Sequence, residues 1–185
     1  QGRDTIWSFI LKTYYRPAYL NRHKFDIVAG NPPWLSYRYI TEPEYQAQVK
    51  KLVFSYGLLG KRDGKLFTHM ELATLFFVLS TDAYLKKNGT IAFVMPRSVL
   101  TGAKQHKRFQ EFLQGKYEHT PTELEKVIDA EEVYPLFNVP ACVLIARKEG
   151  QIAKVSVKTV KGELPAKNVR WSTAKTSLKS TTKSK

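Results

Sequence analysis

The pattern of apolar positions along the chain predicts four buried strands. Short apolar runs cover residues 25–29, 90–95 and 141–146, and residues 126–130 are a shorter candidate. Apolar runs of about four to eight residues between turn residues are typical of buried strands. The first run stops at Gly30-Asn31-Pro32-Pro33, where two prolines cannot donate ladder hydrogen bonds.

Between the first three of these strands, apolar residues at helical spacing predict three helices. The first, over 41–56, and the second, over 68–87, each open with a Thr-x-x-Glu capping box. A third helix is expected over 102–114. Asn88-Gly89 and Gly115 are expected to end the second and third helices, because both sites supply a residue suited to a helix C-terminus.

The order of these elements predicts an α/β fold with a largely parallel sheet. The last two strands follow each other without a helix, so we expect them to form an antiparallel hairpin at one edge of the sheet. These elements place the main unit at 1–150. A valine-rich pattern over 151–171 predicts an extra strand pair or the start of a further domain. The Ser-, Thr- and Lys-rich residues 172–185 are expected to be a disordered basic tail.

Composition indicates a soluble, cytoplasmic protein. The chain has 185 residues, 43% of them hydrophobic, which is enough for a packed core. No apolar run approaches the roughly 18 residues of a membrane span, and no secretory signal pattern opens the sequence. Cys142 is the single cysteine, so an internal disulfide and a four-cysteine zinc site are excluded. The four histidines show no ligand spacing, and we expect no metal.

The charge of the chain favours a polyanionic partner such as DNA or RNA. The formal net charge is +14. Residues 151–185 hold nine Lys or Arg residues and one acid, a net charge of +8, which leaves +6 for residues 1–150. A basic body of this kind suits nucleic acid, although solubility alone would also explain it.

The tetrapeptide Asn31-Pro32-Pro33-Trp34 is the part of the sequence that carries chemistry. It directly follows a predicted buried strand, and reactive groups of open α/β sheets gather at the carboxyl ends of strands. Asn31 offers an amide oxygen as a hydrogen-bond acceptor, and the fixed φ of Pro32 holds its carbonyl in one direction. Trp34 offers a flat face for stacking. Two acceptors beside an aromatic ring fit a planar ring that carries an exocyclic amino group.

An exocyclic amine is a poor nucleophile because its lone pair is delocalised into the ring. Two acceptors that take both N–H bonds draw the nitrogen towards tetrahedral geometry and free the lone pair. A base of duplex DNA must leave the stack to reach such a site, which costs a few kcal/mol. Stacking on Trp34 would return roughly 1–3 kcal/mol.

Residues 25–34, FDIVAGNPPW, resemble the catalytic motif of S-adenosylmethionine-dependent amino-methyltransferases. The most similar group is the adenine-N6 DNA methyltransferases of the large single-chain restriction–modification type, similar to type IIG enzymes. The resemblance continues in order over about residues 7–147. The further matching segments are 66–77 (LFTHMELATLFF), 89–98 (GTIAFVMPRS) and 137–140 (FNVP).

The resemblance implies a Rossmann-like class I methyltransferase fold and transfer of a methyl group from S-adenosylmethionine to the N6 amine of adenine in DNA, within a restriction–modification or related defence system. Its implied catalytic residues are Asn31, Pro32, Pro33 and Trp34. Phe137, with Asn138 beside it, is expected to pack on the flipped base opposite Trp34. Pro32 and Phe77 are expected beside the cofactor. No cysteine lies near the motif, so attack on the methyl group is expected to be direct.

Three basic residues offer a further contact to DNA. Lys104, Lys107 and Arg108 lie at i, i+3 and i+4 of the third predicted helix, opposite its apolar face. They are candidates for phosphate contacts, and a solvated helix face is the alternative interpretation.

The sequence departs from the methyltransferase pattern in one respect. Its ten glycines include no G-x-G spacing, whereas a methyltransferase of this type needs a glycine-rich turn after its first strand. We therefore expect the chain to be the C-terminal part of a catalytic domain without its cofactor-binding front half. S-adenosylmethionine would then bind in the intact parent protein. The strand at 25–29 would expose an unpaired edge, to which the missing half-domain or another copy of the chain could add.

Two alternatives stay open at this stage. The same tetrapeptide pattern occurs in methyltransferases that act on guanine amines of ribosomal RNA or on glutamine amides of release factors, because both present a planar NH₂ group. The long helical stretch between Trp34 and Thr90 favours the DNA family. The third interpretation is a non-catalytic nucleic-acid-binding module.

Overall fold

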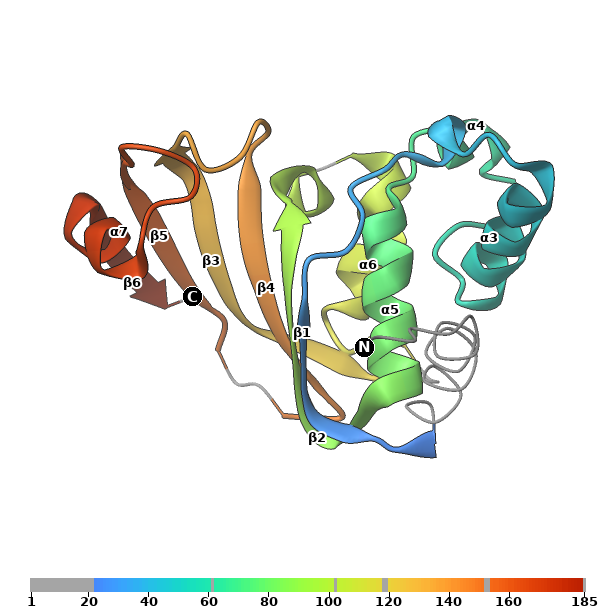
Figure 1. Ribbon diagram of the computed structural model, residues 1–185. Coiled ribbons are helices and arrows are strands. Elements are labelled where there is room, and N and C mark those ends of the chain that lie inside the picture. The colour runs from blue at the N-terminus through green and yellow to red at the C-terminus, as the bar shows by residue number, and fades with distance from the viewer. Residues whose placement is uncertain (1–21, 61, 102, 118–119, 152–153, 185) are drawn as a thin grey trace, which may run out of the picture.

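The computed structural model describes residues 22–60, 62–101, 103–117, 120–151 and 154–184. Its centre is a six-stranded sheet in the order β1-β2-β4-β3-β5-β6 (Figure 1). The strands are β1 (Phe25–Gly30), β2 (Leu85–Pro96), β3 (Thr122–Tyr134), β4 (Ala141–Lys148), β5 (Ser156–Glu163) and β6 (Leu178–Ser184). The four strands expected from apolar runs are present as β1 to β4, and each is longer than its run.

The sheet is mixed. β1 pairs with β2 in parallel, and β3 pairs with β5 in parallel, whereas β2–β4, β3–β4 and β5–β6 are antiparallel. The α/β class and the antiparallel β3–β4 hairpin are therefore confirmed. The hairpin does not lie at an edge as expected, because β5 pairs with the outer side of β3 and β6 extends the sheet further.

The helices differ from expectation mainly at their ends. They are α3 (Pro43–Ser55), α4 (Gly64–Phe67), α5 (Leu72–Tyr84), α6 (Lys107–Phe112) and α7 (Trp171–Ser177), with short 3₁₀ turns at Tyr37–Tyr39, Arg97–Leu100 and Lys104–His106. Neither predicted capping box forms, since Glu42 and Glu71 are the N-cap residues and neither makes a side-chain cap bond.

Two expected helices are shorter in the structure. α5 stops at Tyr84, because Leu85 starts strand β2 and so places Lys86 and Lys87 in the sheet. The third predicted helix is divided into the 3₁₀ turn Lys104–His106 and the short helix α6, and its expected start, residue 102, lies outside the described residues.

The C-terminal residues are ordered, which corrects the expectation of a disordered tail. β6 pairs with β5 over seven residue pairs. Helix α7 buries Ala174 in a small second core with Val133 and Leu164. Composition alone predicted disorder, but the polar residues of this segment pair with strand β5. The segment forms the outer end of the sheet (Figure 1).

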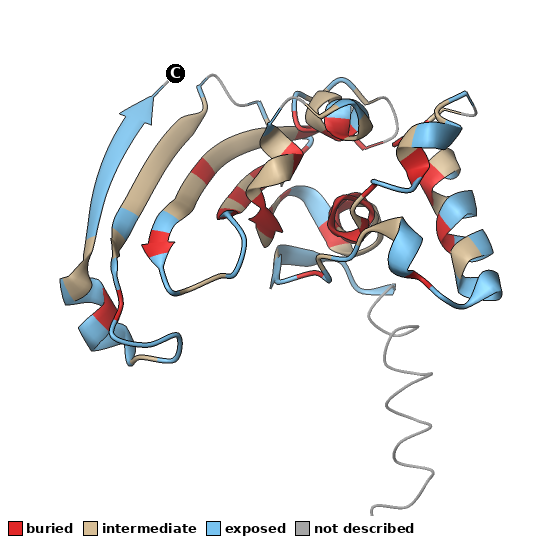
Figure 2. Cartoon of the chain, turned by 90° about the horizontal axis from the view of Figure 1, so that it is seen from above, coloured by how far each residue is buried: buried red, intermediate tan, exposed pale blue. Residues whose placement is uncertain are grey.

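One face of the sheet carries the main core. Along β2 and β4 every second residue is buried, for example Ile91 and Met95 on β2 and Leu144 on β4. Helix α5, buried on almost every side (Figure 2), packs against β1 and β2 on this face together with Phe109 and Phe112 of α6. The large aromatic residues of the helices and β2 meet here, and this cluster holds the sheet and helices together.

The opposite face of the sheet is apolar but only partly covered. The apolar residues of this open face alternate with the core residues and are Ile27, Ala29, Ala92, Val94, Ile128, Val143 and Ile145. Thr90, Lys126 and Arg147 lie on the same face. None is buried, and Ile27 is 69% exposed. A sheet with one solvated face normally alternates apolar and polar residues, whereas apolar residues on both faces are typical of strands covered on both sides.

Strand β1 is an edge strand within the part of the chain that the structure describes. β2 is its single strand partner there, and five of its six residues are exposed. The expected unpaired edge is thus present among these residues. No helix in this part of the chain is long and apolar enough to cross a membrane.

Candidate functional site

The candidate site begins where β1 ends. A side chain at Gly30 would come within 3.3 Å of the Phe93 ring, so this position favours glycine and brings the strand close to β2. After Gly30 the chain exposes Asn31 and buries Pro32. Among the described residues the Asn31 amide has no hydrogen-bond partner. Its oxygen is therefore available to a ligand, as the proposed role of Asn31 requires.

Trp34 is held in place by backbone contacts on both sides. Its indole Nε1 donates a hydrogen bond to the Val94 carbonyl at 3.1 Å. The following residue, Leu35, accepts a bond at 2.9 Å from the Leu72 backbone N–H at the start of α5. The indole is half-buried, so one part of the ring is fixed against the fold and another part is accessible.

Phe137 packs against Trp34 although about a hundred residues separate them in the sequence. Their ring centroids are 5.3 Å apart and the rings are tilted by 35°. Phe137 lies in the loop between β3 and β4, and the carbonyl of Pro140 in that loop accepts a hydrogen bond from the Arg97 backbone N–H at 2.9 Å. The structure thus brings together two of the aromatic residues that the sequence assigned to a base-binding site.

A cavity of about 460 Å³ opens beside Trp34. Apolar residues, hydroxyl groups and charged side chains all line it, and they are Trp34, Ser36, Glu71, Pro96, Arg97, Ser98, Thr101, Glu131, Val139 and Pro140. They come from the loop after β1, the N-cap of α5, the end of β2 and the turn after it, β3, and the loop between β3 and β4. This is the carboxyl end of β1 and β2, where α/β folds usually bind ligands.

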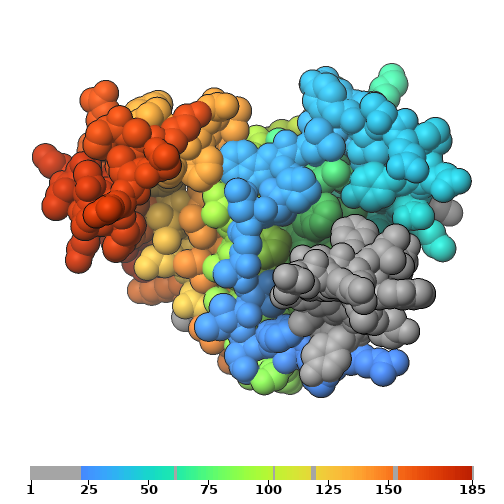
Figure 3. All heavy atoms as spheres, viewed as in Figure 1, coloured from blue at the N-terminus to red at the C-terminus, as the bar shows by residue number. Residues whose placement is uncertain are grey.

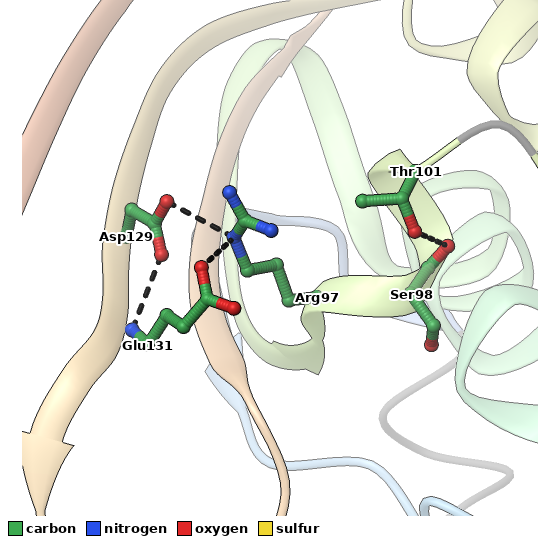
Figure 4. A network of polar contacts seen from close by, with 5 residues as sticks. All are labelled: Arg97, Ser98, Thr101, Asp129 and Glu131. Atoms are coloured by element: carbon green, nitrogen blue, oxygen red, sulfur yellow. Dashed lines mark hydrogen bonds and ion pairs between the residues drawn. The ribbon is translucent and has the colours of Figure 1, made fainter.

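A charged network forms one wall of this cavity (Figure 4). The Nε of Arg97 contacts the carboxylates of Asp129 at 3.0 Å and Glu131 at 3.1 Å, both on β3. The hydrogen bond with Asp129 raises the pKa of Arg97. The Asp129 carboxylate also accepts the Glu131 backbone N–H at 3.2 Å. The network therefore fixes the end of β2 relative to β3, next to the Phe137 loop.

Glu71 contributes a second polar group to the cavity. Its Oε1 accepts a hydrogen bond from the Ser98 hydroxyl at 2.8 Å. Its Oε2 is buried and has no partner among the described residues. Burial raises the pKa of the Glu71 carboxyl, and the Ser98 bond partly opposes this shift. Glu71 is thus a carboxyl group with a raised proton affinity close to Trp34.

The single cysteine is not suited to act as a nucleophile. Cys142 is 1% exposed on the core face of β4. Burial, and to a lesser extent the nearby Asp129 carboxylate, raise the pKa of its thiol to about 12. Since the thiolate is the reactive form, Cys142 stays a neutral thiol near neutral pH. This agrees with an attack on the methyl group that involves no covalent enzyme intermediate.

Phe77 does not line the cavity beside Trp34, so its expected contact with the cofactor stays a prediction. It is 0% exposed and sits in the main core, where its ring packs edge-to-face against Phe93, Phe109 and Phe112. The sequence pattern of α5 could not separate this position from its neighbours, because the helix is apolar on nearly all sides. No described residue replaces Phe77 as a cofactor contact.

The remaining predicted residues do not line the cavity beside Trp34. Lys104, Lys107 and Arg108 are exposed, and Arg108 forms an ion pair with Glu111 at 3.7 Å. None of the three lines the cavity beside Trp34. Asn138 is exposed and accepts a hydrogen bond from Lys167 at 2.6 Å.

Arg97, Ser98 and Glu71 were not singled out by the sequence as site residues. Arg97 and Ser98 directly follow Pro96 at the end of β2, the same kind of position that drew attention to Asn31. The rule that reactive groups gather at the carboxyl ends of strands could therefore have identified them. Glu71 was interpreted as half of a capping box, and its contact with Ser98 depends on a long-range approach that spacing does not reveal.

The family of the chain follows from a comparison with known families. The model of the family described as Eco57I restriction-modification methylase matches residues 4–137, more than half of the chain. The chain belongs to this family. The resemblance to restriction–modification methyltransferases is thereby confirmed. No curated protein matches the sequence.

Solved structures agree with this family in fold. The type IIG restriction endonuclease BpuSI matches with a TM-score of 0.53 and 23% identity over 77% of this chain and 15% of that chain. A modification subunit assigned to a type I restriction enzyme of Vibrio vulnificus YJ016 has a TM-score of 0.51 and 16% identity over 83% of this chain and 29% of that chain.

A third match gives the fold class. A Listeria monocytogenes protein named as a class I S-adenosylmethionine-dependent methyltransferase has a TM-score of 0.51 and 16% identity, over 83% of this chain and 41% of that chain. The α/β sheet of the present chain thus has the class I methyltransferase fold. The chain spans between 15% and 41% of the length of these three structures.

Proposed function

We propose that this chain forms the substrate side of a methyltransferase active site that methylates the N6 amine of adenine in DNA. The observation that carries the proposal is the juxtaposition at the end of β1. There an unpartnered Asn31 amide precedes a fixed Trp34 ring, and Phe137 packs on that ring from a distant loop. Membership of a restriction–modification methylase family favours DNA as the substrate.

In this proposal the chain's own residues prepare the amine. The Asn31 side-chain oxygen and the Pro32 carbonyl accept the two N–H bonds of the extruded base, while Trp34 holds the ring by stacking. This draws electron density back to the nitrogen and makes it a better nucleophile. Stacking on an aromatic ring contributes about 1–3 kcal/mol, which offsets part of the cost of base extrusion.

The described residues do not fit the cofactor in the same way. Phe77 is enclosed in the core, and the sequence holds no G-x-G turn that would let the backbone approach S-adenosylmethionine. S-adenosylmethionine supplies the methyl group when it is bound. We therefore assign to this chain the binding and polarisation of the amine, and no step on the cofactor.

We further propose that the chain is the C-terminal part of the catalytic domain. Two features of the sheet support this. The open face is apolar on four adjacent strands, which is typical of a face covered by a further layer. Strand β1 also has an unpaired outer side among the described residues. A cofactor-binding front half would cover both.

Asn31→Ala in the full-length methyltransferase tests the proposed role. Without the amide acceptor, formation of N6-methyladenine should fall at least about 100-fold, a loss comparable to removal of one transition-state hydrogen bond. Binding of the DNA substrate should change little, because stacking on Trp34 is retained. Product formation is measured by mass spectrometry of digested DNA, and thermal unfolding checks that the variant is folded.

Asn168→Ala is the matched control, since Asn168 is an exposed asparagine outside the site. It should leave turnover unchanged. Full turnover by Asn31→Ala would overturn the proposal. Methylation of ribosomal RNA guanine or of a release-factor glutamine by the wild type, and not of DNA, would assign the site to the alternative substrates. DNA binding without turnover of any substrate would indicate a non-catalytic module.

A further inference from the structure

The C-terminal segment is a folded and strongly basic extension of the sheet. Residues 154–184, which include β5, α7 and β6, hold eight Lys or Arg residues and one acid, Glu163. Among the residues described, none of these cations forms an ion pair. Lys167 alone among them donates a side-chain hydrogen bond, to Asn138. The proposed function uses none of this charge.

Three of the lysines gather on one face of the β5–β6 pair. Lys161 of β5 lies directly opposite Lys179 of β6. Lys183 lies four residues after Lys179 and therefore on the same side of β6. Thr159 and Thr181 form the pair between them. We call these five residues the basic ribbon. All three lysines are exposed.

Like charges directly opposite each other destabilise a strand pair. Glu132 lies beside Lys161 on the neighbouring strand β3, and it is not within ion-pair distance of Lys161. Glu132 and Glu163 line the same surface hollow as Lys161 and Lys179. The basic ribbon is therefore a surface whose lysines form no ion pair among the described residues and alternate with hydroxyl groups. Lysine ammonium groups and threonine hydroxyls are common contacts to phosphate oxygens of nucleic acids, and they read no base sequence.

The basic ribbon lies on the same sheet as the candidate site. Lys167, in the connection between β5 and α7, donates to Asn138 at 2.6 Å, and Asn138 is next to Phe137. Figure 3 shows the C-terminal residues gathered at one end of the molecule, beside the residues that form β3 and the loop after it. β5 and β6 are the third and fourth strands from β2, or about 14–19 Å away at the usual strand spacing.

This separation equals the length of a few base pairs of duplex DNA. With a rise of about 3.4 Å per base pair, 14–19 Å corresponds to roughly four to six base pairs from the target base. A duplex that runs across the strands with its target base at Trp34 would carry its flanking backbone past β5 and β6. The lysines would then neutralise phosphates on one side of the methylated position.

We infer that the basic ribbon binds the sugar–phosphate backbone of duplex DNA on one flank of the target base. The inference rests on the proposed function in its choice of DNA as the partner. The contact holds the duplex and contributes no base recognition, because the ribbon presents ammonium and hydroxyl groups and no planar side chain. Its binding energy should come largely from the release of counterions from the DNA.

The double variant Lys161→Gln/Lys179→Gln of the present chain tests the inference. Binding to a 20-base-pair DNA duplex is measured by fluorescence anisotropy at several salt concentrations. Loss of two phosphate contacts should reduce the slope of log K against log salt by about 1.8. It should weaken binding at low salt by at least about tenfold. The effect should be the same for duplexes of unrelated sequence.

Lys86→Gln/Lys87→Gln is the matched control, because it removes the same charge from exposed positions at the start of β2, near the opposite end of the sheet. It should change the slope by less than half as much. Equal slopes for the two double variants, or no DNA binding by the wild-type chain, would overturn the inference, as would tighter binding of duplex RNA than of DNA. The readout is binding and not methylation, so a failure here is distinguishable from a failure of the proposed function.

Discussion

At the scale of single residues, His106 is a buried polar side chain that the candidate site does not use. It is 0% exposed, and both of its ring nitrogens lack a partner among the described residues. Burial lowers its pKa from 6.5 to about 4. The folded protein therefore holds His106 in the neutral form, while the unfolded chain takes up a proton below about pH 6.5.

This environment predicts a pH-dependent loss of stability. Because the folded pKa lies below the unfolded one, stability from His106 is complete above about pH 6.5 and falls as the pH drops towards 4. Between pH 7.5 and 4.5 the wild type should lose about 2–3 kcal/mol more than His106→Leu. Urea unfolding at both pH values measures this difference. An unchanged difference would show that His106 is paired or hydrated in solution.

At the scale of elements, Lys148 connects the sheet to the end of helix α5. Its Nζ donates to the carbonyls of Thr81 at 3.2 Å, Asp82 at 3.3 Å and Leu85 at 3.2 Å. The last carbonyls of a helix have no partner within the helix, and a cation near them is favourable. Lys148 is 9% exposed, so water cannot easily replace it.

Lys148→Met should therefore destabilise the protein by about 2–3 kcal/mol, since it leaves buried carbonyls without a donor. Equilibrium urea unfolding at neutral pH measures the change. Lys87→Met is the control, because the Lys87 side chain is 71% exposed and its ion pair with Glu149 is on the surface. It should cost less than about 0.5 kcal/mol. Similar losses in both variants would contradict the role of Lys148.

The elements also show what the sequence could predict. Strands β1 to β4 were predicted because each contains a cluster of apolar residues, which face the core and the open face alternately. Neither predicted capping box forms. The Thr-x-x-Glu spacing does not show whether a distant residue of the folded protein binds the glutamate carboxylate instead. In the structure Glu71 takes its hydrogen bond from Ser98, on the distant loop after β2. The β5–β6 pair was missed in part because its pairing is long-range and its composition is polar.

The part of the site that is formed by consecutive residues could be predicted from the sequence. Asn31 to Trp34 follow a strand in sequence, and the structure exposes Asn31 and fixes the Trp34 ring at that strand's end. The resemblance also placed Phe137 opposite Trp34. The Arg97 network was not predicted, because it joins β2 to a bulge in β3 that no sequence pattern marks. The expected role of Phe77 could not be derived from the pattern, because a helix that is apolar on nearly all sides does not show which residue faces the site.

At the scale of the whole molecule, the open face and the β1 edge together predict self-association of the chain on its own. Ile27 lies on both features and is 69% exposed. Exposed apolar edge strands pair with other chains, and a lysine on the edge opposes this. Ile27→Lys should therefore weaken self-association at least about tenfold, as measured by sedimentation velocity at tens of micromolar protein.

Tyr39→Lys controls for the added charge, because Tyr39 is 59% exposed in a 3₁₀ turn outside the sheet. It should leave the association unchanged. A wild-type chain that stays monomeric at these concentrations would contradict the prediction, and so would an equal response of the two variants. Association of this kind would disappear in a longer protein whose own residues cover the sheet.

The packing of Trp34 on Phe137 has a consequence for how a base enters. Stacked rings lie about 3.4 Å apart, so a base sandwiched between two rings needs roughly 7 Å from one outer ring to the other. The two centroids are 5.3 Å apart. In the proposed function, a base that stacks between the two rings requires Phe137 to move away from Trp34. The ring-to-ring contact, worth about 0.5–1.5 kcal/mol, would then be exchanged for contact with the incoming base.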